Sequence, residues 1–123
     1  MATMQAALAG LNQALDAPRL QGVALGNWRW VVRQRMAGVR ESLANEQPPN
    51  VECWLAHRAG AIRKERNVLL GRLSALGPQV LEAADPEQVR VEMKRLLADI
   101  SHHLQRLHDL AYDDVEYEVG GSE

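Results

Sequence analysis

Phenylalanine is absent from this chain of 123 residues, aromatic side chains make up 4% of it, and Cys53 is its one cysteine. A lone cysteine cannot form a disulfide within the chain, and it excludes four-cysteine and Cys/His structural zinc sites. This pattern is typical of a reducing compartment. Few aromatic residues, together with many Ala, Leu, Arg, Glu and Gln residues, favour helix over strand. The composition therefore predicts an all-α protein.

Long apolar runs and a strong net charge are also lacking. No stretch of about 18 uninterrupted apolar residues occurs, so we expect no membrane span. The first residues have neither the basic flank nor the continuous apolar run of a signal peptide. A net charge of -2 gives no overall reason to expect nucleic acid as a partner. We therefore expect a cytoplasmic protein with one folded domain and no membrane partner.

Apolar residues recur at every third or fourth position in four segments, which is the spacing of one face of an α-helix. Thr3 can cap the first helix, and this helix is expected to end near Asp16, because a residue before proline is pushed out of the helical region. The second helix is expected to start at either Pro18 or Asn27, and the sequence does not decide between them. It should run to about Asn45.

The third helix is expected to begin after a cap at Asn50 and to stop at Gly77–Pro78. Glu65 and Arg66 stand where its apolar stripe should continue. They could form a buried pair that fixes the register of the helices, or they could extend to water.

The fourth helix has the clearest start, Asp85–Gln88, which combines a capping acid, a proline at the first helical position and a capping-box glutamine. Short connections make neighbouring amphipathic helices antiparallel. The sequence predicts an antiparallel up-and-down helical bundle of three long helices plus a short N-terminal helix. We assign residues 1–112 to this bundle and residues 113–123 to an acidic C-terminal tail.

The end of the chain has six acids and no base from Asp109 onward. Val115, Tyr117 and Val119 alternate with glutamates, which is the period of a strand that could pair with a partner's sheet. Tyr112, Val115 and Val119 also form a helical stripe. We favour a helix to about Tyr117 followed by a disordered end, and these four apolar residues are candidates for partner binding.

Arginines gather in the second and third helices. Arg29 and Arg33 of the second, with Arg63 and Lys64 of the third, could share a basic surface, and Trp30 is large and apolar yet lies off the core stripe. Such a surface could bind a partner protein or a second copy of the chain in a homodimer. It could also bind nucleic acid by stacking and phosphate contacts. Ion pairs between these arginines and the acidic last helix would leave the surface less available to a protein or to nucleic acid. Of these two partners, we rank nucleic acid below protein.

Catalytic and metal chemistry have weaker support. Asp99, His102 and Asp109 share one helix face and come nearest to a metal site, but a di-metal bundle needs acid-x-x-His motifs on two helices. Cys53 could meet His57 one turn along, without the third group or oxyanion pocket that nucleophilic catalysis uses. We expect no catalytic residues, no bound metal and no cofactor.

The stretch from His102 to Asp113 and the ending Gly120–Glu123 resemble the C-terminus of small uncharacterised helical proteins of actinobacteria. The resemblance covers about the last quarter of the chain, and those proteins have no activity that carries over. It implies that the acidic tail is a recurring feature with a role in binding. The sequence thus favours a non-enzymatic protein–protein interaction or regulatory module.

Overall fold

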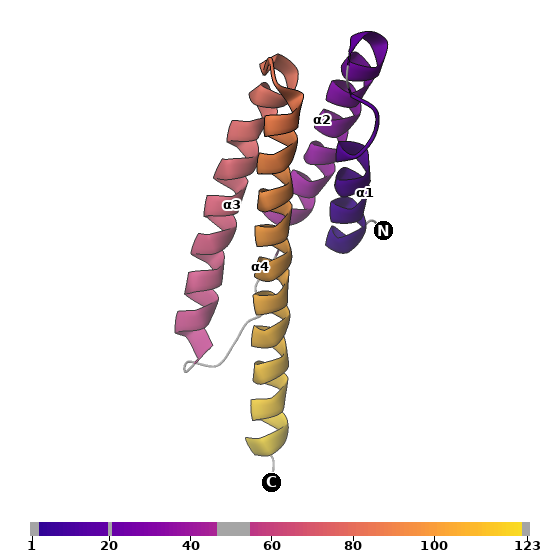
Figure 1. Cartoon of the computed structure of the whole chain (residues 1–123). Coiled ribbons are helices and arrows are strands. Elements are labelled where there is room, and N and C mark those ends of the chain that lie inside the picture. Colours follow the sequence, from indigo (N-terminus) through magenta and orange to yellow (C-terminus); the bar gives the residue numbers. More distant parts are fainter. Residues whose placement is uncertain (1–2, 20, 47–54, 122–123) are drawn as a thin grey trace.

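The computed structural model describes residues 3–19, 21–46 and 55–121, and for residues 114–121 it describes the helical backbone alone. These residues form four helices and no strand: α1 (Met4–Leu15), α2 (Gly22–Ala44), α3 (Ala56–Glu82) and α4 (Pro86–Gly121). Each helix packs against the next, and α1 also contacts α4 (Figure 1). This confirms the predicted all-α bundle of three long helices and one short one. The expected cap at Asn50 and the side chain of Cys53 lie outside the described residues.

The hairpin formed by α1 and α2 follows the sequence predictions at the Thr3 cap and at the C-terminal ends of both helices. The Thr3 hydroxyl oxygen accepts a hydrogen bond from the Ala6 N–H at 3.1 Å, as a capping residue does. Helix α1 ends at Leu15, next to the predicted boundary. The indole N–H of the buried Trp28 donates to the Leu15 carbonyl oxygen at 3.1 Å. Helix α2 then continues to Ala44, beside the expected end at Asn45.

The start of α2 differs from both predicted positions, Pro18 and Asn27. Helix α2 begins at Gly22, directly after Gln21, whose backbone is extended and whose side chain makes no capping hydrogen bond. Gly22 has a φ of 60°, a left-handed conformation that glycine adopts without the steric cost of a Cβ. The chain therefore turns at this glycine, and Asn27 lies more than one turn inside the helix.

Helix α3 continues through Gly77–Pro78, where the sequence predicted its stop. Pro78 lacks the N–H that an interior helical residue donates, and its ring crowds the preceding turn. Gly77 has no Cβ to add to that crowding. Leu76 and Val80 are both buried in the core, so an end at Gly77 would remove Val80 from it. Burial outweighs the local signal, and the helix runs to Glu82.

Helix α4 starts as predicted and is longer than predicted. The Asp85 carboxylate accepts a hydrogen bond from the Glu87 N–H at 3.0 Å, which confirms the capping acid. The backbone stays helical to Gly121, so most of the acidic tail continues α4, past the expected end near Tyr117. In Figure 1 this C-terminal end, drawn in yellow, projects beyond the start of α3.

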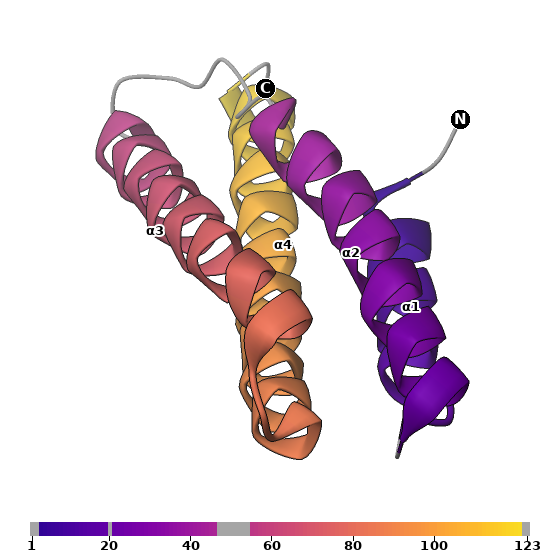
Figure 2. The same cartoon turned by 90° about the horizontal axis from the view of Figure 1, so that it is seen from above.

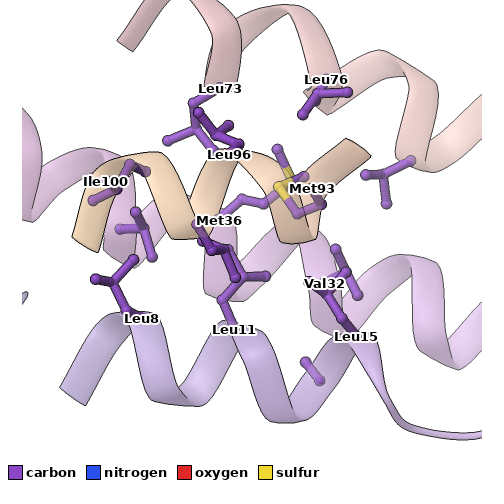
Figure 3. Packing of buried hydrophobic residues seen from close by; sticks show 14 of the residues in the cluster. Leu8, Leu11, Leu15, Val32, Met36, Leu73, Leu76, Met93, Leu96 and Ile100 are labelled. Carbon is purple, nitrogen blue, oxygen red and sulfur yellow. The ribbon is translucent and has the colours of Figure 1, made fainter. Parts of the chain in front are cut away.

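Two apolar clusters form the core. The larger one draws on all four helices, and Figure 3 shows Leu11, Met36, Leu73 and Met93 meeting within it. The smaller one joins the start of α3 to the later part of α4 and contains Leu55, Ala59, Ile62 and Leu110. Seen from above, α4 lies between α3 and the α1–α2 hairpin (Figure 2). Within the described residues, no helix has the length and apolar character that a membrane crossing requires.

Candidate functional site

A groove runs between α2 and α3 and has a volume of about 500 Å³. Its α2 side carries two arginines interspersed with alanines, and its α3 side carries Leu73 and Ser74. The α2 lining residues are Arg33, Met36, Ala37, Arg40, Glu41 and Ala44. Two long cationic side chains therefore border a hollow that small side chains leave open.

Helical spacing explains this lining. Arg33, Ala37, Arg40 and Ala44 are separated by four, three and four residues, so they share one face of α2. That face adjoins the core stripe of the same helix and meets α3. Opposite it, a Cβ added at Gly77 would collide with the Arg33 guanidinium. The lack of a side chain at Gly77 is what lets Arg33 lie against α3.

Ion pairs occupy many of the cations on the faces of the bundle that α4 contacts. Carboxylates neutralise cations along the contacts of α4 with α3 and of α4 with the α1–α2 hairpin. These pairs include Arg19–Glu87 at 2.9 Å, Arg58–Asp113 at 2.6 Å, Arg72–Asp99 at 2.7 Å, Arg90–Asp16 at 2.6 Å and Arg106–Glu65 at 2.6 Å. Arg33 and Arg40 form no ion pair or hydrogen bond with any described residue. Pairing within the chain therefore neutralises several cations near α4. Arg33 and Arg40 at the groove have no such partner, and neither do the exposed Arg35, Lys64 and Arg95 outside it.

Arg29 has a structural role beside the groove. Its guanidinium donates hydrogen bonds to the Leu81 carbonyl oxygen and, at 2.9 Å, to the Ala83 carbonyl oxygen. These carbonyls belong to the C-terminal end of α3, where helices lack internal donors and attract cations. Trp30, the next residue, is 63% exposed. Arg29 thus joins α2 to the end of α3. Trp30, three residues before Arg33, offers exposed apolar surface on the same side of α2 as that arginine.

The predicted residues of α3 lie apart from one another. Arg63 precedes Ser74 by 11 residues, three helical turns or about 16 Å, so it shares the groove-facing side of α3. Lys64 is rotated by about 100° from Arg63 and lies on the outer side of the helix. Both side chains are exposed. The structure therefore assembles Arg33 and Arg40 at the groove, extends this face to Arg63 and leaves Lys64 outside it.

The predicted residues of the C-terminal segment all belong to α4. Tyr112 is 64% exposed. The backbone at Val115, Tyr117 and Val119 is helical. This segment therefore forms the predicted helix, and the alternative of an extended strand is wrong. Their side chains lie outside the described part of the structure.

The three candidate metal ligands do not converge. Asp99 forms its ion pair with Arg72, and Asp109 accepts a hydrogen bond from the Gln105 side chain at 3.0 Å. His102 is exposed. In the described ranges, no group of three or more His, Cys, Asp or Glu side chains is placed to hold a metal ion.

A buried polar layer separates the two apolar clusters. Its central residue, His103, was not among the candidate binding or metal residues that the sequence suggested. His103 is 0% exposed. Its Nδ1 lies 2.7 Å from Glu65 Oε1, and its Nε2 lies 2.7 Å from Glu46 Oε1. A neutral imidazole has one N–H, so two such contacts require either an imidazolium ion or a protonated glutamic acid. The histidine thereby links the end of α2 to α3 and α4.

Arginines complete the layer. The Arg106 guanidinium donates to both oxygens of Glu65, at 3.0 and 2.6 Å, and Arg66 donates to the Glu46 backbone carbonyl at 2.7 Å. Burial raises the pKa of Glu65, but the hydrogen bonds from Arg106 and His103 outweigh it and bring the pKa below its ordinary value. Glu65 and Arg66 are therefore not each other's partner, and both contribute to a layer that joins α3 and α4 to the residue that follows α2.

The sequence held one usable signal for this layer. Ile100, His103, Leu104 and Leu107 follow the spacing of the α4 core stripe, so His103 occupies a core position. Glu65 and Arg66 interrupt the corresponding stripe of α3. Polar residues at core positions of two facing helices indicate a buried polar contact between them. Whether His103 lies opposite Glu65, however, depends on the register of α3 and α4, which the tertiary structure determines.

Comparisons with known proteins identify no relative of this chain. No family model, no curated protein and no solved structure matches this chain.

Proposed function

We propose that this chain is a non-enzymatic protein–protein interaction module that binds an acidic helix of a partner protein in the groove between α2 and α3. The observation that carries the proposal is that Arg33 and Arg40, which have no partner among the described residues, line the same groove together. The proposed location is the cytoplasm, in keeping with a single cysteine in 123 residues.

Electrostatics support an acidic partner. An arginine whose charge is not matched within the chain remains available for a charge-assisted, bidentate contact with a carboxylate. Arg33 and Arg40 are seven residues apart, or about two helical turns. A partner helix with carboxylates at a similar spacing can meet both. Glu41, which also lines the groove, would disfavour a misaligned acidic partner.

The shape of the groove supports a helix as the partner element. Helices approach closely where small residues line the contact, because ridges of one helix fit the spaces between side chains of the other. Ala37, Ala44 and Ser74 provide this low surface. The exposed Trp30, three residues before Arg33 on α2, is the type of aromatic residue that contributes most to protein–protein binding energy.

Nucleic acid is the second candidate, because Trp30 lies beside the arginines and could stack on a base. The observations favour protein. Sustained contact with a phosphate backbone needs a long basic surface, whereas Lys64 is on a different side of α3 and Arg29 is bonded to the end of that helix.

A defined probe can test the groove. A fluorescent peptide of residues 109–123 is acidic and has a helical apolar stripe, so it represents the proposed partner. We expect it to bind the full chain at low salt and to lose about tenfold in affinity between about 50 and 300 mM salt. The double variant Arg33→Gln, Arg40→Gln should weaken binding by about tenfold or more.

Matched controls separate the groove from general charge. The double variant Lys64→Gln, Arg95→Gln removes the same charge from exposed cations that do not line the groove, and it should bind the peptide as the native chain does. A peptide with all acids changed to amides should not bind. Equal losses in both double variants, or preferential binding of a single-stranded oligonucleotide, would contradict the proposal.

Self-association is measured in the same series. If sedimentation shows a salt-sensitive dimer that is lost both in the Arg33→Gln, Arg40→Gln variant and on deletion of residues 113–123, the occupant of the groove is a second copy. Monomers throughout, combined with peptide binding, would point to a separate partner protein.

A further inference from the structure

The acidic end of the chain, residues 109–123, has the charge and the backbone of the helix that the groove is proposed to bind. It contains six acids and no base, and α4 stays helical through its last described residue. Asp109 and Glu116 are seven residues apart, as are Arg33 and Arg40 of the groove, so each pair spans about two helical turns and shares one face. The acids of one helix therefore match the arginines of the other in spacing.

The acidic end cannot reach the groove of its own chain. Asp99 pairs with Arg72, which is next to Leu73 of the groove. Asp113 pairs with Arg58, which precedes Arg72 by 14 residues, or about 21 Å of helix. Beyond Asp113 the backbone of α4 continues as a helix away from the groove (Figure 1). An acidic end that occupies a groove must therefore come from another molecule.

This end of α4 is accessible to another molecule. It projects beyond the start of α3 in Figure 1. Asp109 is exposed, and it accepts a hydrogen bond from Gln105 of the same helix but forms no ion pair with a described residue. Its charge can therefore meet a cation of a second chain.

Aromatic residues accompany the charges on both helices. Tyr112 follows Asp109 by three residues on α4, and Trp30 precedes Arg33 by three residues on α2. Each aromatic residue is thus about 60° around its helix from the charged one, and the two are 64% and 63% exposed. A contact between the acids and the arginines brings this aromatic surface to the interface, where tyrosine, tryptophan and arginine are enriched.

We infer that the acidic end of α4 in one copy of the chain binds in the α2–α3 groove of a second copy. The carboxylates of Asp109 and Glu116 accept charge-assisted hydrogen bonds from Arg33 and Arg40. This inference rests on the proposed function, because it names the acidic helix that the groove binds. The contact joins two different surfaces, so each added copy leaves one groove and one acidic end for the next.

Two variants that each lack one half of the contact provide the test. The groove variant is Arg33→Gln, Arg40→Gln, and the end variant is Asp109→Asn, Glu116→Gln. In sedimentation we expect the native chain to associate as its concentration rises and each variant alone to stay monomeric. An equimolar mixture should form a 1:1 complex that grows no further, because the end variant supplies the groove and the groove variant supplies the acidic end. Its affinity should fall about tenfold between about 50 and 300 mM salt.

NMR locates the contact within this complex. The isotope-labelled end variant, titrated with the unlabelled groove variant, should show saturable amide shifts at Ala37, Arg40 and Ser74 and none at Lys64. With the labels exchanged, the shifts should fall in residues 109–121. Shifts at Lys64 in place of the groove would overturn the inference.

The matched control removes the same charge from the same segment. Asp114→Asn, Glu118→Gln changes two acids that lie about 140° and 180° around the helix from Asp109, and this variant should self-associate within about twofold of the native affinity. Circular dichroism and a cooperative melt show that each variant is folded. Equal losses in the end variant and this control would overturn the inference.

The inference and the proposed function fail in different ways. If the native chain stays monomeric while the peptide of residues 109–123 binds the groove, the second copy is not the occupant and the proposed function stands. If neither the peptide nor a second copy binds, both are overturned. A mixture of the two variants that forms no complex, although the native chain associates, would show that self-association uses another surface.

Discussion

Nδ1 of the fully buried His103 lies 2.7 Å from Oε1 of Glu65, a residue 38 positions earlier on the facing helix. This contact places a charged layer across a helical bundle whose core is otherwise apolar. A buried ion pair contributes little net stability compared with well-packed hydrocarbon, but removal of one partner leaves the other buried without compensation. The layer is therefore sensitive to single substitutions and specific for one register.

Replacement of the histidine tests this sensitivity. His103→Ala leaves Glu46 and Glu65 without their shared donor, so we expect the free energy of unfolding to fall by about 3 to 5 kcal/mol. Urea denaturation at neutral pH measures it. The neighbouring and exposed His102→Ala should change stability by less than about 0.5 kcal/mol. A loss in His103→Ala no larger than this would show that the layer does not hold the helices together.

Acid should weaken the bundle through Glu65. Its lowered pKa means that the unfolded chain binds a proton at higher pH than the folded chain, so stability rises with pH in this range. The contribution of Glu65 is complete above its ordinary pKa of 4.5 and is lost as the pH falls through the lower value of the folded state. Asp16 and Glu87, whose pKa values are lowered chiefly by hydrogen bonds from Arg90 and Arg19 respectively, act in the same direction.

Urea denaturation of Glu65→Gln at several pH values between about 7 and 3 checks this sign. The variant should be less stable than the native chain at pH 7, and its stability should fall less steeply below pH 4.5, because Gln does not titrate. Glu82→Gln, which removes an exposed acid, should keep the native slope. A native slope in Glu65→Gln would refute the assignment.

Arg29 should stabilise the end of α3 in particular. Arg29→Gln removes the guanidinium that donates to the Leu81 and Ala83 carbonyl oxygens, and we expect a loss of about 1 kcal/mol together with faster hydrogen exchange in the last turn of α3. Arg95→Gln is the control, since Arg95 has no such contact. Unchanged exchange near Leu81 would mean that the carbonyls are equally well satisfied by water.

The two apolar clusters should differ in stability. Leu11→Ala in the larger cluster and Leu110→Ala in the smaller one each empty a fully buried position, and each should cost about 2 to 5 kcal/mol. Leu110→Ala should lower the free energy of unfolding by less than Leu11→Ala does, because the cluster around Leu110 is the smaller one. Because the polar layer separates the clusters, Leu110→Ala should speed hydrogen exchange mainly at the start of α3 and in the later part of α4. Uniformly faster exchange in both variants would show that the clusters unfold as one unit.

Local signals were sufficient for the helices whose ends are determined by neighbouring residues. Thr3 and Asp85 cap α1 and α4 because a side-chain oxygen reaches a backbone N–H two or three residues away, and no distant contact is needed. The apolar spacing likewise identified the buried face of each helix. The same signals failed at Gly22, where chain reversal required a left-handed backbone, and at Pro78, where burial of Val80 kept α3 intact.

The candidate sites also depend partly on local sequence and partly on the tertiary structure. From the sequence alone it followed that arginines gather in the second and third helices and that acids dominate the last one, because charge and helical periodicity are properties of nearby residues. The tertiary structure decided which arginines pair with α4, which remain at the groove, and that His103 lies between Glu46 and Glu65. Those outcomes depend on the register between helices far apart in the chain, which is set by how whole surfaces pack and by the burial of polar groups.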